Sequence, residues 1–223
     1  MADLRSRLRR FVPTPRRNPL ALGYLAVLLA TTLFARFGDA DLVDRLQAFS
    51  SSDGHNLLDH PVQALVLSGL WVAGPIWMPY FWAFALTVAP LERRIGARRT
   101  IGVLAAGHVL ATLLSQAAVG LEVSTGRLAP EALDSVDIGV SYGVLASLGA
   151  LAAVLPGRGR PVLLAGAVAM TGYQFLSESE LVSRVGHPSA LLVGVAVGHW
   201  LRGGSGGGLP VRRLAERLVP SRV

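Results

Sequence analysis

Long apolar stretches separated by short charged connectors restrict this chain to folds that a membrane accommodates. A helix needs roughly 20 mainly apolar residues to cross the hydrocarbon core of a bilayer. Such stretches recur along the 223 residues, and only 16% of the residues are charged, whereas soluble domains carry roughly 25%. The pattern predicts an all-α fold, a polytopic membrane helical bundle with six transmembrane helices.

The six predicted spans are bounded by changes between polar and apolar sequence. They cover residues 19–37, a second helix that ends near residue 91, and residues 101–121, 138–155, 162–176 and 186–201. The second span is the hardest to delimit, because residues 62–91 are too long for one crossing and Gly74, Pro75 and Pro79 interrupt them. We expect a partly buried or interfacial lead-in up to about Ala73, followed by the helix.

The connectors alternate in charge. Residues 1–18, 92–99, 156–161 and the C-terminal tail are basic, whereas residues 38–61, 122–137 and 177–184 are acidic. Because cytoplasmic loops carry an excess of basic residues, we expect a multi-pass protein of the plasma membrane with both termini in the cytoplasm.

This alternation predicts three parts in the chain. They are a basic N-terminal tail (1–18), a six-helix membrane domain (19–202), and a Gly-rich linker with a basic C-terminal tail (203–223). Within the last part, residues 210–218 would form either a short basic amphipathic helix on the inner leaflet or a solvated tail.

Charge and residue types exclude several kinds of function. The net charge of +7 comes from Arg residues that flank apolar spans, so it indicates a lipid bilayer and no nucleic acid as partner. The chain has no Cys, which excludes disulfides, thiolate metal sites and a Cys nucleophile. The His residues lie at different predicted depths without carboxylates at ligand spacing, so we expect no metal site.

Two polar residues are predicted to lie at matching depth. Ser141 follows an acidic connector at the start of the fourth span, and His187 follows another at the start of the sixth. At about 1.5 Å per residue, both lie a few ångströms below the outer surface and can touch if these helices pack together. His108 lies nearer the bilayer middle, where we do not expect it to meet them, and His199 faces the opposite leaflet.

A Ser and a His within hydrogen-bond reach form a nucleophile and its general base. The first turn of a helix adds free backbone N–H groups that stabilise an oxyanion forming at Ser141. The plainer alternatives stay open: a Ser in a membrane helix often only packs, and a His beside Pro188 at a helix start can serve as a cap.

Small residues favour close packing of the fourth and sixth helices. Gly143 and Gly149 lie on the fourth, and Gly194 and Gly198 lie four residues apart on the sixth. Such small residues let two backbones approach in a membrane, although they are common and identify no function by themselves.

The chain resembles the rhomboid family of intramembrane serine proteases over roughly residues 62–202. Gly139-Val140-Ser141-Tyr142 matches the family's GxSG motif except at its last position, and Gly149 matches the small residue eight positions after the Ser. His187 is followed by small residues three and seven positions later, Ala190 and Gly194, as in the family. Residues 92–99 resemble the acidic and basic segment that follows the family's second helix.

The resemblance implies that Ser141 is a nucleophile, that His187 is its base, that the substrates are transmembrane proteins, and that no cofactor is needed. Active rhomboids also carry a His and an Asn in the second helix that stabilise the oxyanion. Here those places fall near Ile76 and Tyr80, and only Tyr80 can donate a hydrogen bond. Tyr142 replaces a small Gly, where its bulk would obstruct a substrate; Gly139, Tyr142 and Tyr80 are the candidate auxiliary residues.

Three hypotheses follow. The first is an intramembrane serine protease, and the second is a proteolytically inactive rhomboid-like protein that binds transmembrane helices. The third is a small-solute transporter. Its only support is His108 and Gln116 within the third span, and the sequence shows no clear internal repeat of the kind that many transporters carry.

Overall fold

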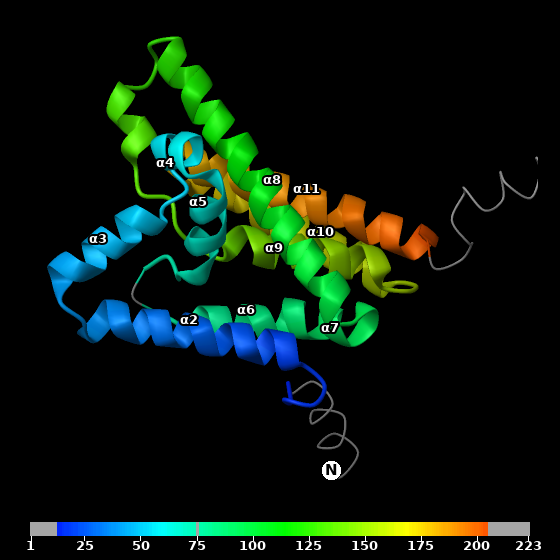
Figure 1. Cartoon of the computed structure of the whole chain (residues 1–223). Helices are drawn as coiled ribbons and strands as arrows, with labels where there is room; N and C mark the ends of the chain where they lie inside the picture. The colour runs from blue at the N-terminus through cyan, green and yellow to red at the C-terminus, as the bar shows by residue number, and fades with distance from the viewer. Residues whose placement is uncertain (1–12, 75, 205–223) are drawn as a thin grey trace, which may run out of the picture.

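The computed structural model describes residues 13–74 and 76–204, and every regular element within these ranges is a helix (Figure 1). The predicted amphipathic helix at residues 210–218, most of the C-terminal linker and most of the basic tail 1–18 lie outside the described residues.

The first half of the described chain contains one long helix and a group of short ones. They are α2 (Pro19–Phe37), α3 (Ala40–Ser50), α4 (Gly54–Asp59), α5 (Pro61–Leu67), the 3-10 turn η1 (Ser68–Leu70), α6 (Met78–Ala83), the π-helical turn η2 (Phe84–Val88) and α7 (Ala89–Ile95). The second half contains α8 (Ala97–Ser124), the 3-10 turn η3 (Pro130–Asp134), α9 (Ser141–Val154), α10 (Gly159–Ser177) and α11 (Leu181–Gly204).

Three of the described helices are long and apolar enough to cross a membrane. They are Pro19–Phe37, Ala97–Ser124 and Leu181–Gly203. Helix α9 is apolar but shorter, with 14 residues. The all-helical membrane fold agrees with the sequence prediction, and the number of six spans stays a prediction.

Helix α9 forms the centre of the bundle, packed between α8, α10 and α11. Every residue from Tyr142 to Ala153 is buried. A helix that is apolar all round lies in a protein core or in a membrane, and the Ala- and Gly-rich sequence of α9 lets its neighbouring helices come close. The first residue of this central helix is Ser141.

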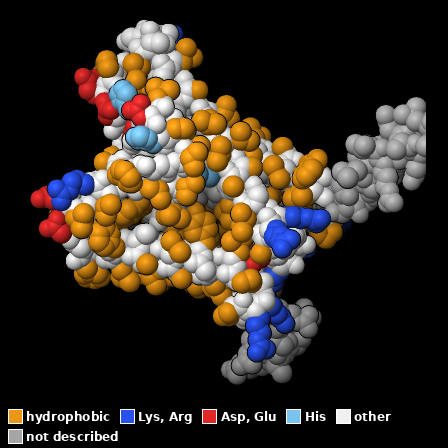
Figure 2. All heavy atoms as spheres, in the orientation of Figure 1, with side chains coloured by type: hydrophobic (Ala, Val, Ile, Leu, Met, Phe, Trp, Pro, Cys, Tyr) orange, Lys and Arg blue, Asp and Glu red, His pale blue; other side chains and the backbone are white. Residues whose placement is uncertain are grey.

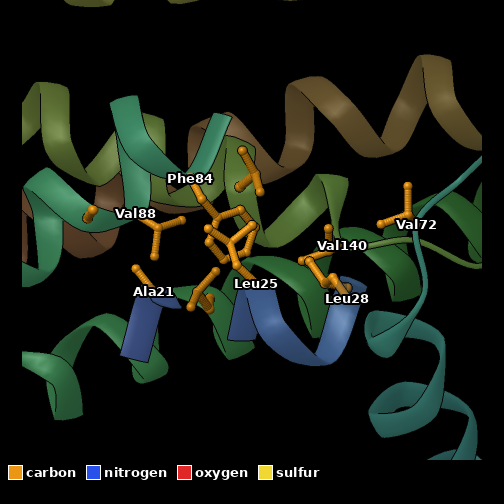
Figure 3. Packing of buried hydrophobic residues seen from close by; sticks show 10 residues of the cluster. Ala21, Leu25, Leu28, Val72, Phe84, Val88 and Val140 are labelled. Carbon is orange, nitrogen blue, oxygen red and sulfur yellow. The ribbon is translucent and has the colours of Figure 1, made fainter. Parts of the chain in front are cut away.

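A second cluster of apolar side chains joins α2 to the middle of the chain. Leu25 and Leu28 of α2 lie beside Phe84 and Val88 of the π-helical turn, and Val140 completes the group (Figure 3). Val140 is 1% exposed and immediately precedes Ser141, so this cluster fixes the backbone from which α9 begins.

The acidic residue of the basic 92–99 segment has a structural role. Glu92 is 4% exposed, and its carboxylate accepts hydrogen bonds from the backbone N–H groups of Leu20 (2.9 Å) and Ala21 (3.0 Å). These N–H groups belong to the first turn of α2, where no intrahelical acceptor exists. Glu92 therefore caps α2 from a distant part of the sequence.

Several predicted helix limits differ from the structure. Helix α11 begins at Leu181, not at Gly186, because residues 181–185 add a turn whose Val182 packs against the buried cluster around Tyr142. Pro188 therefore lies inside the helix, and His187 does not cap it. The second helix begins only at Met78, after the chain turns at Gly74 with φ of 84°.

Charged side chains gather at opposite ends of the molecule (Figure 2). Acidic and His side chains lie around α4 and the loop before α9, and acidic side chains with a basic one lie at the corner between α2 and α3, whereas the other visible basic side chains lie near the start of α2 and the turn between α7 and α8. Hydrophobic side chains cover much of the surface between them. This distribution has the form of an apolar belt between two polar ends, as a bilayer requires.

Candidate functional site

Ser141 and His187 lie within contact distance of each other. The Nε2 atom of His187 is 3.3 Å from the Oγ atom of Ser141. Ser141 is partly exposed, whereas His187 is 9% exposed. The two residues are 46 positions apart in sequence, and the packing of α9 against α11 brings them together.

Glycines allow this close approach of α9 and α11. A Cβ atom added at Gly194 would overlap the carbonyl oxygen of Ala146, and one added at Gly149 would overlap that of Leu191. Gly198 packs in the same way against the Cα atom of Ala150. Any larger side chain at these positions would push the two backbones apart.

Two further small residues occupy different places. Ala190 is fully buried next to α9. Gly143 faces Leu104 of α8, so its predicted contact with the sixth helix is wrong. Its position one residue after Tyr142 turns it away from α11, because successive residues in a helix point in different directions.

The side chain of Tyr142 packs into the bundle behind the Ser–His pair. Its hydroxyl donates a hydrogen bond to the carbonyl oxygen of Val182 (3.1 Å). Its ring meets the His187 ring edge-on, with centroids 5.6 Å apart and an interplanar angle of 77°. A Cβ atom at Gly186 would overlap the Tyr142 ring. Tyr142 is 4% exposed and supports His187 from the side.

A large cavity gives access to the pair. It has a volume of about 1320 Å³ and is lined by Ser141, His187 and Tyr80, among others. Residues 135–139 and Glu178, Glu180, Val182 and Ser183 also line it, which places the cavity on the side of the acidic connectors. Water and an extended peptide therefore have room to reach Ser141 from that side.

The second helix offers few groups to stabilise an oxyanion. Ile76 is 61% exposed and precedes α6, whereas Tyr80 lines the cavity. Gly139 has a φ of 145°, and its N–H group already donates to the carbonyl oxygen of Ser68 (2.9 Å). The remaining donors are the N–H groups in the first turn of α9, which have no intrahelical acceptor.

The loop before Ser141 is held by Asp137, a residue that the sequence analysis did not single out. The Asp137 N–H group donates to the Oγ atom of Ser51 (2.9 Å). The Asp137 carbonyl oxygen accepts from the N–H and hydroxyl groups of Ser52 (2.9 and 3.0 Å). Gln116 donates to the Asp137 carboxylate (3.0 Å). The signal in the sequence for this role was an acid four residues before Ser141, together with Gln116 in the predicted third span.

Burial raises the pKa of the Asp137 carboxyl to about 6. Because the pKa is higher in the folded than in the unfolded protein, folding favours the protonated acid, and stability falls as pH rises from about 4 to 6. Asp137→Asn keeps an acceptor for Gln116 and removes the charge. We expect the free energy of unfolding of the variant to exceed that of wild type by about 2–3 kcal/mol at pH 8 and to equal it at pH 4.

Thermal unfolding in detergent at the two pH values measures this difference. Asp44→Asn, at another acid that lines the cavity, is the matched control. An equal gain for Asp137→Asn at both pH values would contradict the expectation.

The remaining His residues have other partners. His108 lies with its Nε2 atom 3.1 Å from Ser68 Oγ, and it lines the same cavity as Ser141 and His187. His199 contacts Arg160 at the other end of the bundle. Within the described ranges, no group of three or more His, Cys, Asp or Glu residues is placed to hold a metal ion.

The comparison with protein families identifies a matching family model. The family model described as rhomboid-like protein matches residues 15–206, which is most of the chain. No curated protein and no solved structure gives a significant match. The match includes the whole bundle from α2 to α11 and both members of the Ser–His pair.

Proposed function

The chain belongs to the rhomboid-like protein family, and from this premise we propose that it is an intramembrane serine protease. Ser141 is the nucleophile, and His187 is the general base. The observation that carries the proposal is the distance of 3.3 Å between His187 Nε2 and Ser141 Oγ, in a cavity wide enough for a peptide.

The reaction follows from the positions of these atoms. The Oγ atom of Ser141 attacks the carbonyl carbon of a peptide bond while His187 Nε2 takes its proton. The oxyanion forms beside the N–H groups of the first turn of α9, with the positive end of the helix dipole behind it. The proton then passes to the leaving amide nitrogen, and water from the cavity hydrolyses the acyl-enzyme.

The proposed substrates are transmembrane proteins, cleaved in a segment that unwinds near the outer surface. An extended segment is needed because the backbone carbonyl of a helix is hydrogen-bonded and shielded.

The proposal includes six spans in the plasma membrane with both termini in the cytoplasm. The acidic connectors and the cavity then face outward, which agrees with the basic residues at the opposite end.

Cleavage of a single-span substrate in liposomes tests the proposal. The substrate carries a fluorophore at each end, and its products are separated on a gel. We expect wild-type protein to release two fragments and Ser141→Ala and His187→Ala to release none. Ser147→Ala is the matched control, because Ser147 lies on the same helix with its hydroxyl bonded to the carbonyl oxygen of Gly143 (2.9 Å). Cleavage that persists in Ser141→Ala would contradict the proposal that Ser141 is the nucleophile.

The second candidate is an inactive rhomboid-like protein that binds transmembrane helices. The observation that favours it is the lack of a His and an Asn in the second helix, where Ile76 and Tyr80 stand. The loss of one oxyanion donor typically lowers the rate by about 10²–10³. Binding of the fluorescent substrate without any Ser141-dependent fragment would support this candidate. Gln116 and His108, the residues behind the transporter hypothesis, bond to Asp137 and Ser68.

A further inference from the structure

One nitrogen of the candidate base is buried without a partner. The Nε2 atom of His187 faces Ser141, whereas its Nδ1 atom is buried and has no hydrogen-bond partner in the described part of the chain. When Nε2 accepts a proton, Nδ1 must carry the other ring proton. A buried N–H group without an acceptor opposes the formation of the imidazolium ion. The site therefore lacks a group that accepts from Nδ1.

The cavity contains several carboxylates that are candidates for this acceptor. They are Asp44, Asp137, Glu178 and Glu180. Asp137 is bonded to Gln116 and anchors the loop before α9. Of the four, Glu178 and Glu180 belong to the connector that leads into α11, the helix that carries His187, and Glu178 is half-buried whereas Glu180 is exposed.

Glu178 has a fixed backbone, and its side chain lines the same cavity as His187. It follows the last residue of α10, where its N–H group donates to the carbonyl oxygen of Gln174 (2.8 Å), so its backbone is fixed. Within the described residues, its carboxylate has no other hydrogen bond or ion pair, and it lines the cavity together with His187. A long side chain on a fixed backbone can change its rotamer at small cost.

We propose that Glu178 is a positioning residue that accepts a hydrogen bond from His187 Nδ1 during the reaction, so that the site acts as a Ser–His–Glu triad. The inference rests on the proposed function. The proton of Ser141 moves to Nε2 and then to the leaving amide nitrogen, while the Glu178 carboxylate stays ionised throughout. Its negative charge stabilises the imidazolium ion and holds the ring in the orientation that Ser141 needs.

Other charged and titratable groups surround the cavity. They are Arg36 on α2, Asp44 on α3, Tyr80 on α6, His108 on α8, Asp137 before α9, Tyr142 on α9, and Glu180 in the connector. Arg184, on α11 one turn before His187, lies over the Phe175 ring at 4.9 Å. Glu180 belongs to the same connector as Glu178 and is exposed, so Glu180→Gln is the matched control for a change of charge at this place.

The test combines two measurements on the full-length protein in detergent, with Glu178→Gln and Glu180→Gln beside wild type. The first is the rate at which a fluorophosphonate labels Ser141, from pH 5 to 9. We expect Glu178→Gln to lower the rate at least ten-fold and to move the acid limb of the profile to lower pH by about one unit. Glu180→Gln is expected to match wild type, and Glu178→Asp to recover part of the rate. Equal profiles for all variants would overturn the proposal.

The second measurement does not depend on catalysis. The Nδ1–H proton of His187, identified by its loss in His187→Ala, is followed by NMR in protein labelled with ¹⁵N-histidine, at a pH where His187 is protonated and carboxylates stay ionised. We expect a downfield resonance in wild type that moves upfield in Glu178→Gln and stays in place in Glu180→Gln. A resonance that stays unchanged in Glu178→Gln would overturn the proposed contact between Glu178 and His187 Nδ1. Wild-type protein that is never labelled but shows this shift would contradict the proposed function and leave the Glu178 contact supported.

Discussion

Gly194→Ala is expected to separate Ser141 from His187. A Cβ atom at this position would overlap the carbonyl group of Ala146, which is backbone of the central helix and cannot rotate away. Overpacking of a tight core costs about 1–3 kcal/mol. Displacement of a catalytic pair by about 1 Å costs about a hundred-fold in rate. We therefore expect a lower unfolding temperature and at least a hundred-fold slower labelling of Ser141 by a fluorophosphonate.

Gly166→Ala is the matched control for this prediction. Gly166 lies within α10, and a Cβ atom there meets no atom within 4 Å. Since Ala stabilises a helix by roughly 0.5–1 kcal/mol relative to Gly, this variant should be as stable as wild type or slightly more stable, and it should be labelled equally fast. Normal labelling of Gly194→Ala would mean that the close packing of α9 and α11 does not position the pair.

Tyr142→Gly is expected to destroy the site even though it restores the family's GxSG motif. Tyr142 is buried, its hydroxyl bonds to Val182, and its ring contacts His187. Removal of a buried aromatic side chain costs about 3–5 kcal/mol, and here it also removes the lateral support of the His187 ring. We expect a large loss of stability and the loss of labelling at Ser141.

Tyr142→Phe separates the two contributions of this side chain. It keeps the ring against His187 and loses only the hydrogen bond to Val182, which is worth about 1 kcal/mol. We expect labelling within a few-fold of wild type, measured beside Tyr142→Gly at a temperature where both are folded. Faster labelling or faster substrate cleavage by Tyr142→Gly would show instead that Tyr142 obstructs the site, as its place in the motif suggested.

The sequence was sufficient to predict the elements that depend on apolar length and charge. The class of fold, the order of the long helices and the shared depth of Ser141 and His187 follow from these patterns. The structure adds that α9 and α11 are neighbours, which the positions of Gly149 and Gly194 favoured without requiring it.

Other parts depended on tertiary contacts that no local pattern contains. The true start of α11 lies in a polar connector, because its first turn packs on neighbouring helices. The short helices α3, α4 and α5 were predicted only as a connector and a lead-in. The roles of Asp137 and Glu92 come from hydrogen bonds to residues more than 70 positions away in sequence, so no local pattern predicts these contacts.

Labelling with a fluorophosphonate tests the central claim most directly, because the probe reacts only with an activated serine and needs no knowledge of the substrate. Folded wild-type protein is expected to form a covalent phosphonyl ester at Ser141, with loss of fluoride, that mass spectrometry locates on the peptide containing this residue. Ser141→Ala and His187→Ala are expected to remain unlabelled. If folded wild-type protein is not labelled, or if Ser141→Ala is labelled equally, Ser141 is not an activated nucleophile and the protease account is wrong.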